Sequence, residues 1–214
     1  MSGARPRRIG LLGGSFDPPH LGHLHVARVA RERFGLDRLV CMPAARSPYK
    51  PGREPASGAD RLAMLELLLA GEPGCETSDL ELRRGGPSYT IDTVRALPAA
   101  LGEPEDCEIY LLLGSDNLAG LAGWREATAL LERVQPVVVR RGPPLAAELA
   151  ALRPQLPAAL LEKLARGALD LPPVDASSTA VRAARGAASL AGLPIPPTVA
   201  RYIREHGLYG ASSA

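Results

Sequence analysis

The sequence has few of the features that mark secreted, disulfide-rich or membrane proteins. Its three cysteines, Cys41, Cys75 and Cys107, are odd in number and widely spaced, so they fit neither a disulfide framework nor a zinc knuckle. No apolar run reaches the length that crosses a membrane, and the basic start leads into an apolar segment without the pattern of a signal peptide. We therefore expect buried thiols, no membrane association and a cytoplasmic location.

Lysine and aromatic residues are also scarce. Lys50 and Lys163 are the only lysines, and aromatic residues make up 4% of the chain, which leaves few rings for stacking on bases. The net charge is only +2, and the arginine pairs, such as Arg7-Arg8 and Arg140-Arg141, are scattered along the chain. We expect no nucleic-acid partner, and the oligomeric state stays open.

A glycine-rich turn follows the first apolar segment but lacks both common nucleotide-binding signatures, Gly-x-Gly-x-x-Gly and the Gly-Lys-Ser/Thr ending of a P-loop. It carries three of the four histidines, in the run Gly-Gly-Ser-Phe-Asp-Pro-Pro-His-Leu-Gly-His-Leu-His over residues 13–25. Helical spacing begins at His20, so the turn joins a strand to a helix, where unpaired amides favour a phosphate. His20 and His23 are three apart and are expected to face the same anion.

Apolar runs alternate with helical patterns along the chain. Strands are expected over residues 9–12, 39–42, 108–113 and 137–139, and less clearly over 76–82 and 168–171, with helices over 20–34, 59–70, 90–97 and 124–133. Such alternation implies a parallel sheet whose ligands bind beyond the carboxyl ends of the strands. The sequence predicts an α/β fold, a Rossmann-like doubly wound parallel sheet with helices on both faces and a C-terminal helical segment.

A single domain over residues 1–214 is the simplest organisation. We expect a sheet core over about 8–142 and an Ala- and Pro-rich helical cover over 143–173. A second polar motif and a closing helix are expected over 174–209, because apolar residues recur at helical spacing over 197–209.

The second polar motif reads Asp-Ala-Ser-Ser-Thr-Ala-Val-Arg over residues 175–182. Hydroxyls at the start of a helix either cap the helix or bind a phosphate.

The early histidines allow a metal site of His20, His23 and His25 as an alternative, although His25 points away from the face that the other two share. The residues alone leave these alternatives open.

The run over residues 13–23 resembles the signature of the nucleotidyltransferase superfamily, whose Gly-Gly-x-Phe-Asp-Pro and His-x-Gly-His elements cradle the triphosphate of ATP. The second motif is similar to the Ser-Ser-Thr-x-x-Arg element of the nicotinate-nucleotide adenylyltransferase family, which faces His-x-Gly-His across the phosphates. Further matches are the Ser-Tyr-Thr-Ile-Asp-Thr segment over 88–93, the Gly-Ser-Asp strand end over 114–116, Trp124, and the C-terminal segment over 199–209.

The resemblance implies a role for residues in each motif. The catalytic group would be His20, His23, Lys50 and Arg182. ATP would be bound by Gly13, Gly14, Ser15, Phe16, Gly22, Gly114, Asp116, Ser177, Ser178 and Thr179. The nicotinate nucleotide would be bound by Ser88, Tyr89, Thr90 and Trp124. Gly22 would let the nucleotide lie close to the helix. No protein metal ligands are expected, since Mg²⁺ would arrive with ATP.

Three of these positions carry open questions. Trp124 is suited either to stacking on the pyridine ring or to the apolar core. Asp116 either accepts hydrogen bonds from ribose hydroxyls or caps the helix that follows. The family usually shows Pro-Pro-His-Lys after the second strand, whereas this chain reads Ser-Pro-Tyr-Lys over 47–50, so a neutral hydroxyl replaces a histidine at Tyr49 and Lys50 keeps its charge.

The implied reaction is the transfer of AMP from ATP to nicotinate mononucleotide, which forms deamido-NAD and pyrophosphate in NAD biosynthesis. The phosphate of the acceptor is then the nucleophile, so no nucleophile from the protein is needed. Three alternatives remain: the same fold acting on nicotinamide mononucleotide or pantetheine phosphate, a regulator that binds nucleotide without turnover, and a small metalloprotein that uses the histidines.

Overall fold

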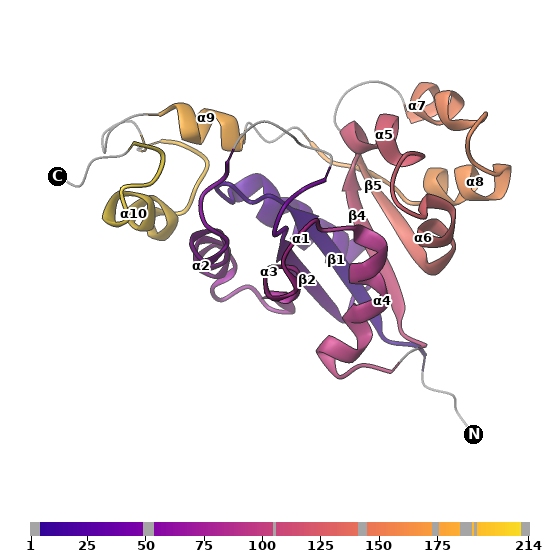
Figure 1. The fold of residues 1–214 in the computed structure, drawn as a ribbon, viewed down its shortest axis with the longest axis horizontal. Helices are drawn as coiled ribbons and strands as arrows, with labels where there is room; N and C mark the ends of the chain where they lie inside the picture. Colours follow the sequence, from indigo (N-terminus) through magenta and orange to yellow (C-terminus); the bar gives the residue numbers. More distant parts are fainter. Residues whose placement is uncertain are drawn as a thin grey trace.

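A six-stranded parallel sheet with the order β3-β2-β1-β4-β5-β6 forms the centre of the molecule (Figure 1). The structure is a computed structural model that describes residues 5–48, 54–104, 106–140, 145–172, 176–184, 190 and 192–210. The strands are β1 (Arg8–Gly14), β2 (Arg38–Pro43), β3 (Cys75–Thr77), β4 (Glu108–Gly114), β5 (Val134–Arg140) and β6 (Ala168–Asp170). The chain winds outward from β1 to β3 and then from β4 to β6. The direction of winding therefore reverses between β1 and β4.

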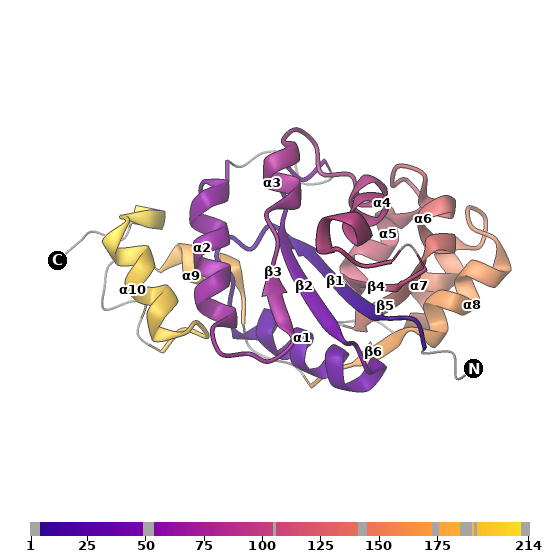
Figure 2. The same ribbon diagram turned by 90° about the horizontal axis from the view of Figure 1, so that it is seen from below.

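Alternate residues of the central strands pack into two separate apolar clusters, one on each face of the sheet. In β5, Val137 and Val139 pack on one face and Val138 on the other, and both faces are buried, as expected for a parallel sheet. One cluster is completed by helices α1 (Leu21–Phe34), α2 (Gly58–Leu69), α9 (Ser178–Ala183) and α10 (Pro197–Glu205). The other is completed by α4 (Thr90–Leu101), α5 (Leu118–Leu121), α6 (Ala127–Arg133), α7 (Leu145–Leu152) and α8 (Ala158–Arg166). Figure 2 shows α1 and α4 on opposite sides of the sheet, which confirms the predicted doubly wound fold.

Several predicted elements differ from the structure. The helix expected over 90–97 continues to Leu101, and the strand expected over 137–139 spans Val134–Arg140. The strand expected over 76–82 ends at Thr77, and a short helix, α3 (Leu80–Arg84), occupies the second half of that range. The helix expected over 124–133 starts only at Ala127. The closing helix ends at Glu205, because His206 leaves helical geometry, and a separate 3-10 turn, η3 (Leu208–Gly210), follows.

The helices at the two ends of the sheet lie far apart. Helices α9 and α10 lie beside α2 at one end of the molecule, and α7 and α8 lie at the other (Figures 1 and 2). The Tyr202 hydroxyl on α10 donates a hydrogen bond of 3.0 Å to Asp60 Oδ1 on α2.

Among the described residues, no helix combines the length and the apolar character of a membrane span.

The three cysteines are free thiols, and only one of them is fully buried. Cys41 lies in β2 and burial raises its pKa above the ordinary value. Cys75 and Cys107 are partly exposed, so the expectation of buried thiols is correct for Cys41 and too strong for the other two.

Candidate active site

Two adjacent cavities with shared lining residues lie at the carboxyl ends of β1 and β4. The larger has a volume of about 530 Å³ and the smaller about 170 Å³. Both are lined by Gly13 and Gly14 at the end of β1 and by Gly114 at the end of β4. They therefore lie where the winding of the sheet reverses, which is the position at which open α/β sheets bind ligands.

The turn after β1 sets the orientation of His23. The peptide between Asp17 and Pro18 is cis, and His20 then takes an extended conformation as the N-cap of α1. The His20 backbone N–H donates to Nδ1 of His23 over 3.1 Å. Because Nδ1 accepts this bond, the proton of the neutral ring lies on Nε2. The ring of His23, which lines the larger cavity, therefore carries its N–H donor at Nε2.

His20 takes a different position from the one predicted for it. Its ring stacks on that of His23 with 3.7 Å between centroids, and only 3% of the residue is exposed. His20 lies outside the described lining of both cavities, and it contacts the cavity-lining His23. A Cβ on Gly22 would lie 2.9 Å from His20 Nδ1 and 3.1 Å from the Cβ of Ala176. The missing side chain of Gly22 therefore makes room for His20 and for the segment before α9.

Residues of α9 reach the same cavity from the far end of the sequence. Arg182 donates from Nη1 to the backbone oxygen of Asp17 over 2.7 Å and from Nη2 to Thr179 Oγ1 over 3.1 Å. The Ser178 hydroxyl donates to the backbone oxygen of Pro18 over 2.8 Å. Ser178, Thr179 and Arg182 line the larger cavity together with His23, whereas Ser177 caps α9 through the amide of Thr179. The fold thus brings the early histidine and the late arginine to one cavity.

The end of β4 presents Asp116 to the larger cavity. A Cβ on Gly114 would collide with the Asp116 carboxylate in its present position, so the glycine leaves room for this side chain. Asp116 lies inside a 3-10 turn, η1 (Ser115–Asn117), and it caps neither this turn nor α5. Asn117 Nδ2 donates to Asp116 Oδ1 over 3.3 Å. The capping alternative for Asp116 is wrong, and its exposed carboxylate is available for a ligand hydroxyl.

The smaller cavity is lined by three of the four residues predicted to bind the pyridine nucleotide. These are Ser88, Thr90 and Trp124. Trp124 also packs against the apolar cluster on its face of the sheet, so the residue both belongs to the core packing and lines this cavity. Tyr89 lies outside the described lining, and its ring packs under the Arg125 guanidinium at 4.9 Å.

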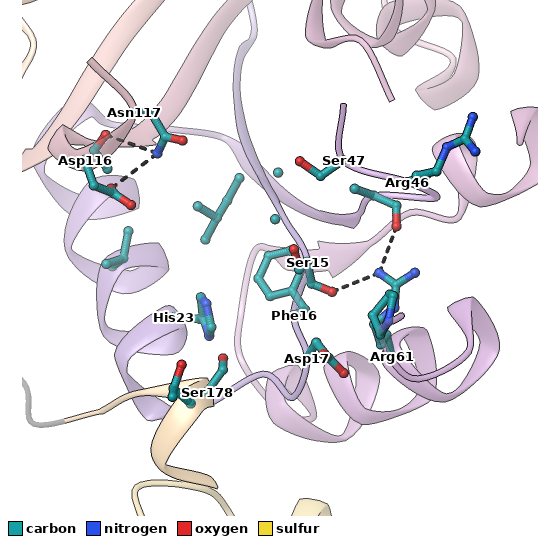
Figure 3. A pocket seen from close by; sticks show the side chains of 18 of the residues that line it. Ser15, Phe16, Asp17, His23, Arg46, Ser47, Arg61, Asp116, Asn117 and Ser178 are labelled. Atoms are coloured by element: carbon teal, nitrogen blue, oxygen red, sulfur yellow. Dashed lines mark hydrogen bonds between the residues drawn. The ribbon is translucent and has the colours of Figure 1, made fainter. Parts of the chain in front are cut away.

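The structure adds Arg61, which the sequence analysis missed. Arg61 lies on α2, is 2% exposed and lines the larger cavity. It donates from Nη1 to the backbone oxygens of Ser15 and Ala44 over 2.9 and 2.8 Å (Figure 3). Its Nε donates to the backbone oxygen of Ala56 over 2.9 Å. Burial lowers the pKa of the guanidinium from its ordinary value, yet an arginine stays charged. Arg61 therefore ties three segments of the cavity wall together and brings a positive charge to it.

A second missed residue is Asp17, which is 3% exposed and lines the larger cavity. Its Oδ1 accepts hydrogen bonds from the Ala56 amide over 3.1 Å and from the Tyr209 hydroxyl over 2.7 Å. The predicted phosphate ligand Lys50, together with Tyr49, lies outside the described residues.

The structure gives no support to a metal centre built from the histidines. Within the part of the chain that is described, no three His, Cys, Asp or Glu side chains come together as candidate ligands. The stacked rings of His20 and His23 face each other, which is not a geometry in which two imidazoles share a metal ion.

Comparison with known proteins agrees with this geometry. A family model described as cytidylyltransferase-like matches residues 11–184. A probable nicotinate-nucleotide adenylyltransferase of Bordetella petrii is 48% identical over 204 residues, which cover 95% of this chain and 99% of that protein. Another, from Dehalococcoides mccartyi, is 38% identical and covers 94% of this chain and 97% of its own length.

A solved structure shares the fold at low sequence identity. Plasmodium falciparum nicotinic acid mononucleotide adenylyltransferase complexed with NaAD matches with a TM-score of 0.71 and 17% identity, over 97% of this chain and 100% of that chain. The chain belongs to the cytidylyltransferase-like family and, within it, to the nicotinate-nucleotide adenylyltransferases.

Proposed function

We propose that this chain transfers AMP from ATP to the phosphate of nicotinate mononucleotide and releases pyrophosphate. One observation carries the proposal: the two cavities meet at the ends of β1 and β4 and differ in chemistry. The larger is lined by cationic and hydrogen-bond-donating groups, His23, Arg61 and Arg182, which suit a triphosphate. The smaller offers the aromatic plane of Trp124, which suits a pyridinium ring. ATP and the acceptor would thus meet where the cavities join.

In this reaction an oxygen of the acceptor phosphate attacks the α-phosphorus of ATP. A new P–O bond forms, the bond from the α-phosphorus to the bridging oxygen breaks, and its electron pair leaves with pyrophosphate. No covalent enzyme intermediate is needed, so the protein acts by alignment and by stabilising charge. The Nε2–H of His23 and the guanidinium of Arg182 are the donors proposed for oxygens that gain charge. Lys50 stays a predicted ligand of the same phosphates.

Mg²⁺ is proposed to enter as part of the MgATP substrate. The described carboxylates of the larger cavity are Asp17 and Asp116, and Asp17 already accepts two hydrogen bonds. An ion that keeps several waters and binds mainly phosphate oxygens needs no cage of protein ligands. His23 and Arg182 would then bind the phosphate oxygens that the ion leaves open.

The position of Thr90 supports nicotinate rather than nicotinamide as the acceptor base. Thr90 is the first residue of α4, a helix of 12 residues, and lines the smaller cavity. The first amides of a helix and its dipole favour a carboxylate, whereas the NH₂ of a nicotinamide would face other donors. The start of α4 at this cavity therefore favours the carboxylate of nicotinate over the amide of nicotinamide.

Pyrophosphate release with three acceptors tests the proposed function. With ATP and Mg²⁺, we expect nicotinate mononucleotide to give a kcat/KM about 10²-fold above that with nicotinamide mononucleotide. Pantetheine phosphate is expected to give no turnover. A preference for either of these two acceptors would contradict the proposed acceptor, and ATP binding without turnover on any of them would support a regulator.

Replacing Trp124 with alanine is expected to raise KM for nicotinate mononucleotide about tenfold and to leave KM for ATP within about twofold. The reason is that Trp124 lines only the smaller cavity. Trp124→Phe, which keeps an aromatic plane, serves as the matched control and should recover most of the affinity. Equal rises in both KM values would show that the indole acts only in the core.

A further inference from the structure

The last described turn of the chain contacts the loop that carries the first phosphate motif. In η3, the Tyr209 hydroxyl donates to Asp17 Oδ1 over 2.7 Å, between residues 192 positions apart. The contact is protected from water on the acceptor side, since Asp17 is 3% exposed. A hydrogen bond to a buried carboxylate is among the stronger polar contacts in a protein. Its loss leaves a buried oxygen with one hydrogen bond fewer, which is costly.

Asp17 links this turn to α9. The Oδ1 atom of Asp17 accepts from Tyr209, and its backbone oxygen accepts from Nη1 of Arg182 over 2.7 Å. The next residue, Pro18, accepts from Ser178 Oγ over 2.8 Å. A shift of Asp17 would therefore move the anchor of the Arg182 guanidinium within the larger cavity.

Asp17 also follows a residue that packs on His23. The rings of Phe16 and His23 lie 4.9 Å apart between centroids. Phe16 has a φ of 48° and Tyr209 a φ of 58°, in the left-handed region that non-glycine residues rarely adopt. Such conformations persist only where surrounding contacts hold them, and they concentrate at functional sites. The hydrogen bond from Tyr209 to Asp17 joins the two strained segments.

We propose that Tyr209 is a positioning residue for the phosphate site. Its hydroxyl fixes the Asp17 carboxylate, and Asp17 in turn holds Arg182 through its backbone oxygen and keeps Phe16 against His23. The inference rests on the proposed function for its effect on turnover, but its effect on nucleotide binding is independent of the acceptor. Tyr209 itself lies outside the described lining of the larger cavity, so it acts through Asp17.

The test compares two tyrosine hydroxyls of the C-terminal segment. Tyr209→Phe removes the bond to Asp17 and keeps the ring. Tyr202→Phe removes the hydrogen bond from Tyr202 on α10 to Asp60 on α2. Neither Tyr202 nor Asp60 is in the described lining of the two cavities. Titration calorimetry with α,β-methylene ATP measures binding, and pyrophosphate release measures turnover. Both variants should stay folded, and Tyr209→Phe is expected to lower the melting temperature more than Tyr202→Phe, because Asp17 is buried and Asp60 is partly exposed.

For Tyr209→Phe we expect the Kd of the ATP analogue to rise about tenfold and kcat to fall about tenfold, while Tyr202→Phe leaves both within about twofold. Arg182→Ala should weaken analogue binding several-fold less in the Tyr209→Phe background than in the wild type, because its guanidinium is already displaced. Equal values for the two phenylalanine variants, or fully multiplicative losses with Arg182→Ala, would overturn the inference.

The outcomes separate this inference from the proposed function. A wild type that binds the analogue but gives no turnover with nicotinate mononucleotide contradicts the function, and the shift in Kd then decides the inference alone. A wild type with turnover and no shift in Kd or kcat for Tyr209→Phe contradicts only the inference. A wild type that does not bind the analogue overturns both.

Discussion

Replacing His23 with alanine is expected to lower kcat by about 10² to 10³-fold and to change the affinity for ATP little, as the loss of one transition-state donor does in other enzymes. The expectation follows from the way the ring is held. Its Nδ1 accepts from the His20 amide, its ring stacks on that of His20, and the Phe16 ring lies 4.9 Å away between centroids, so Nε2–H has a fixed direction. Such a donor needs no reorganisation when charge develops on a phosphate oxygen.

Steady-state kinetics with saturating nicotinate mononucleotide measure this effect, and His25→Ala provides the matched control. His25 lies on the same helix but outside the described lining of both cavities, so its replacement should leave kcat unchanged. A His23→Ala variant with the kcat of the wild type would exclude His23 as a donor in the transition state.

Replacing Arg61 with methionine is expected to lower the free energy of unfolding by about 3 kcal/mol, because three backbone carbonyls each lose a donor worth about 1 kcal/mol. These carbonyls belong to Ser15, Ala44 and Ala56, in three segments around the larger cavity. We also expect a higher KM for ATP, since the variant removes a positive charge that lines this cavity.

Urea unfolding and ATP kinetics measure these two effects. Arg201→Met is the control, because the Arg201 side chain is 63% exposed on α10, and its change should stay within about 0.5 kcal/mol. Arg61→Lys should keep more affinity for ATP than Arg61→Met but lose the bridging of the three segments. An unfolding free energy equal to that of the wild type would show that water replaces the guanidinium at no cost.

The fold could be predicted because the central strands are recognisable from their own residues. The runs over 39–42 and 137–139 are uninterrupted apolar segments, as buried parallel strands are, and the helices between them show a clear helical period. Helix α3 could not be found in this way. It has five residues, little more than one turn, so the alternation of Leu80 and Leu82 was indistinguishable from that of a strand.

The candidate site was predictable where its residues stand in one motif. The stretch around His23 was predicted to bind a phosphate and the stretch around Arg182 either to cap a helix or to bind one, and the fold brings both to one cavity. Arg61 was missed because its partners are backbone oxygens of three separate segments, which no local pattern reveals. A signal was present, since Arg61 stands four and seven residues before Leu65 and Leu68 on the buried face of α2.

The central claim is that His23 and Arg182 act on the same bound triphosphate. A crystal structure with Mg²⁺ and α,β-methylene ATP tests it most directly. The account predicts phosphate oxygens within about 3 Å of both His23 Nε2 and the Arg182 guanidinium, in the larger cavity. A triphosphate bound elsewhere, or one that contacts His23 while Arg182 points away from it, would contradict the account.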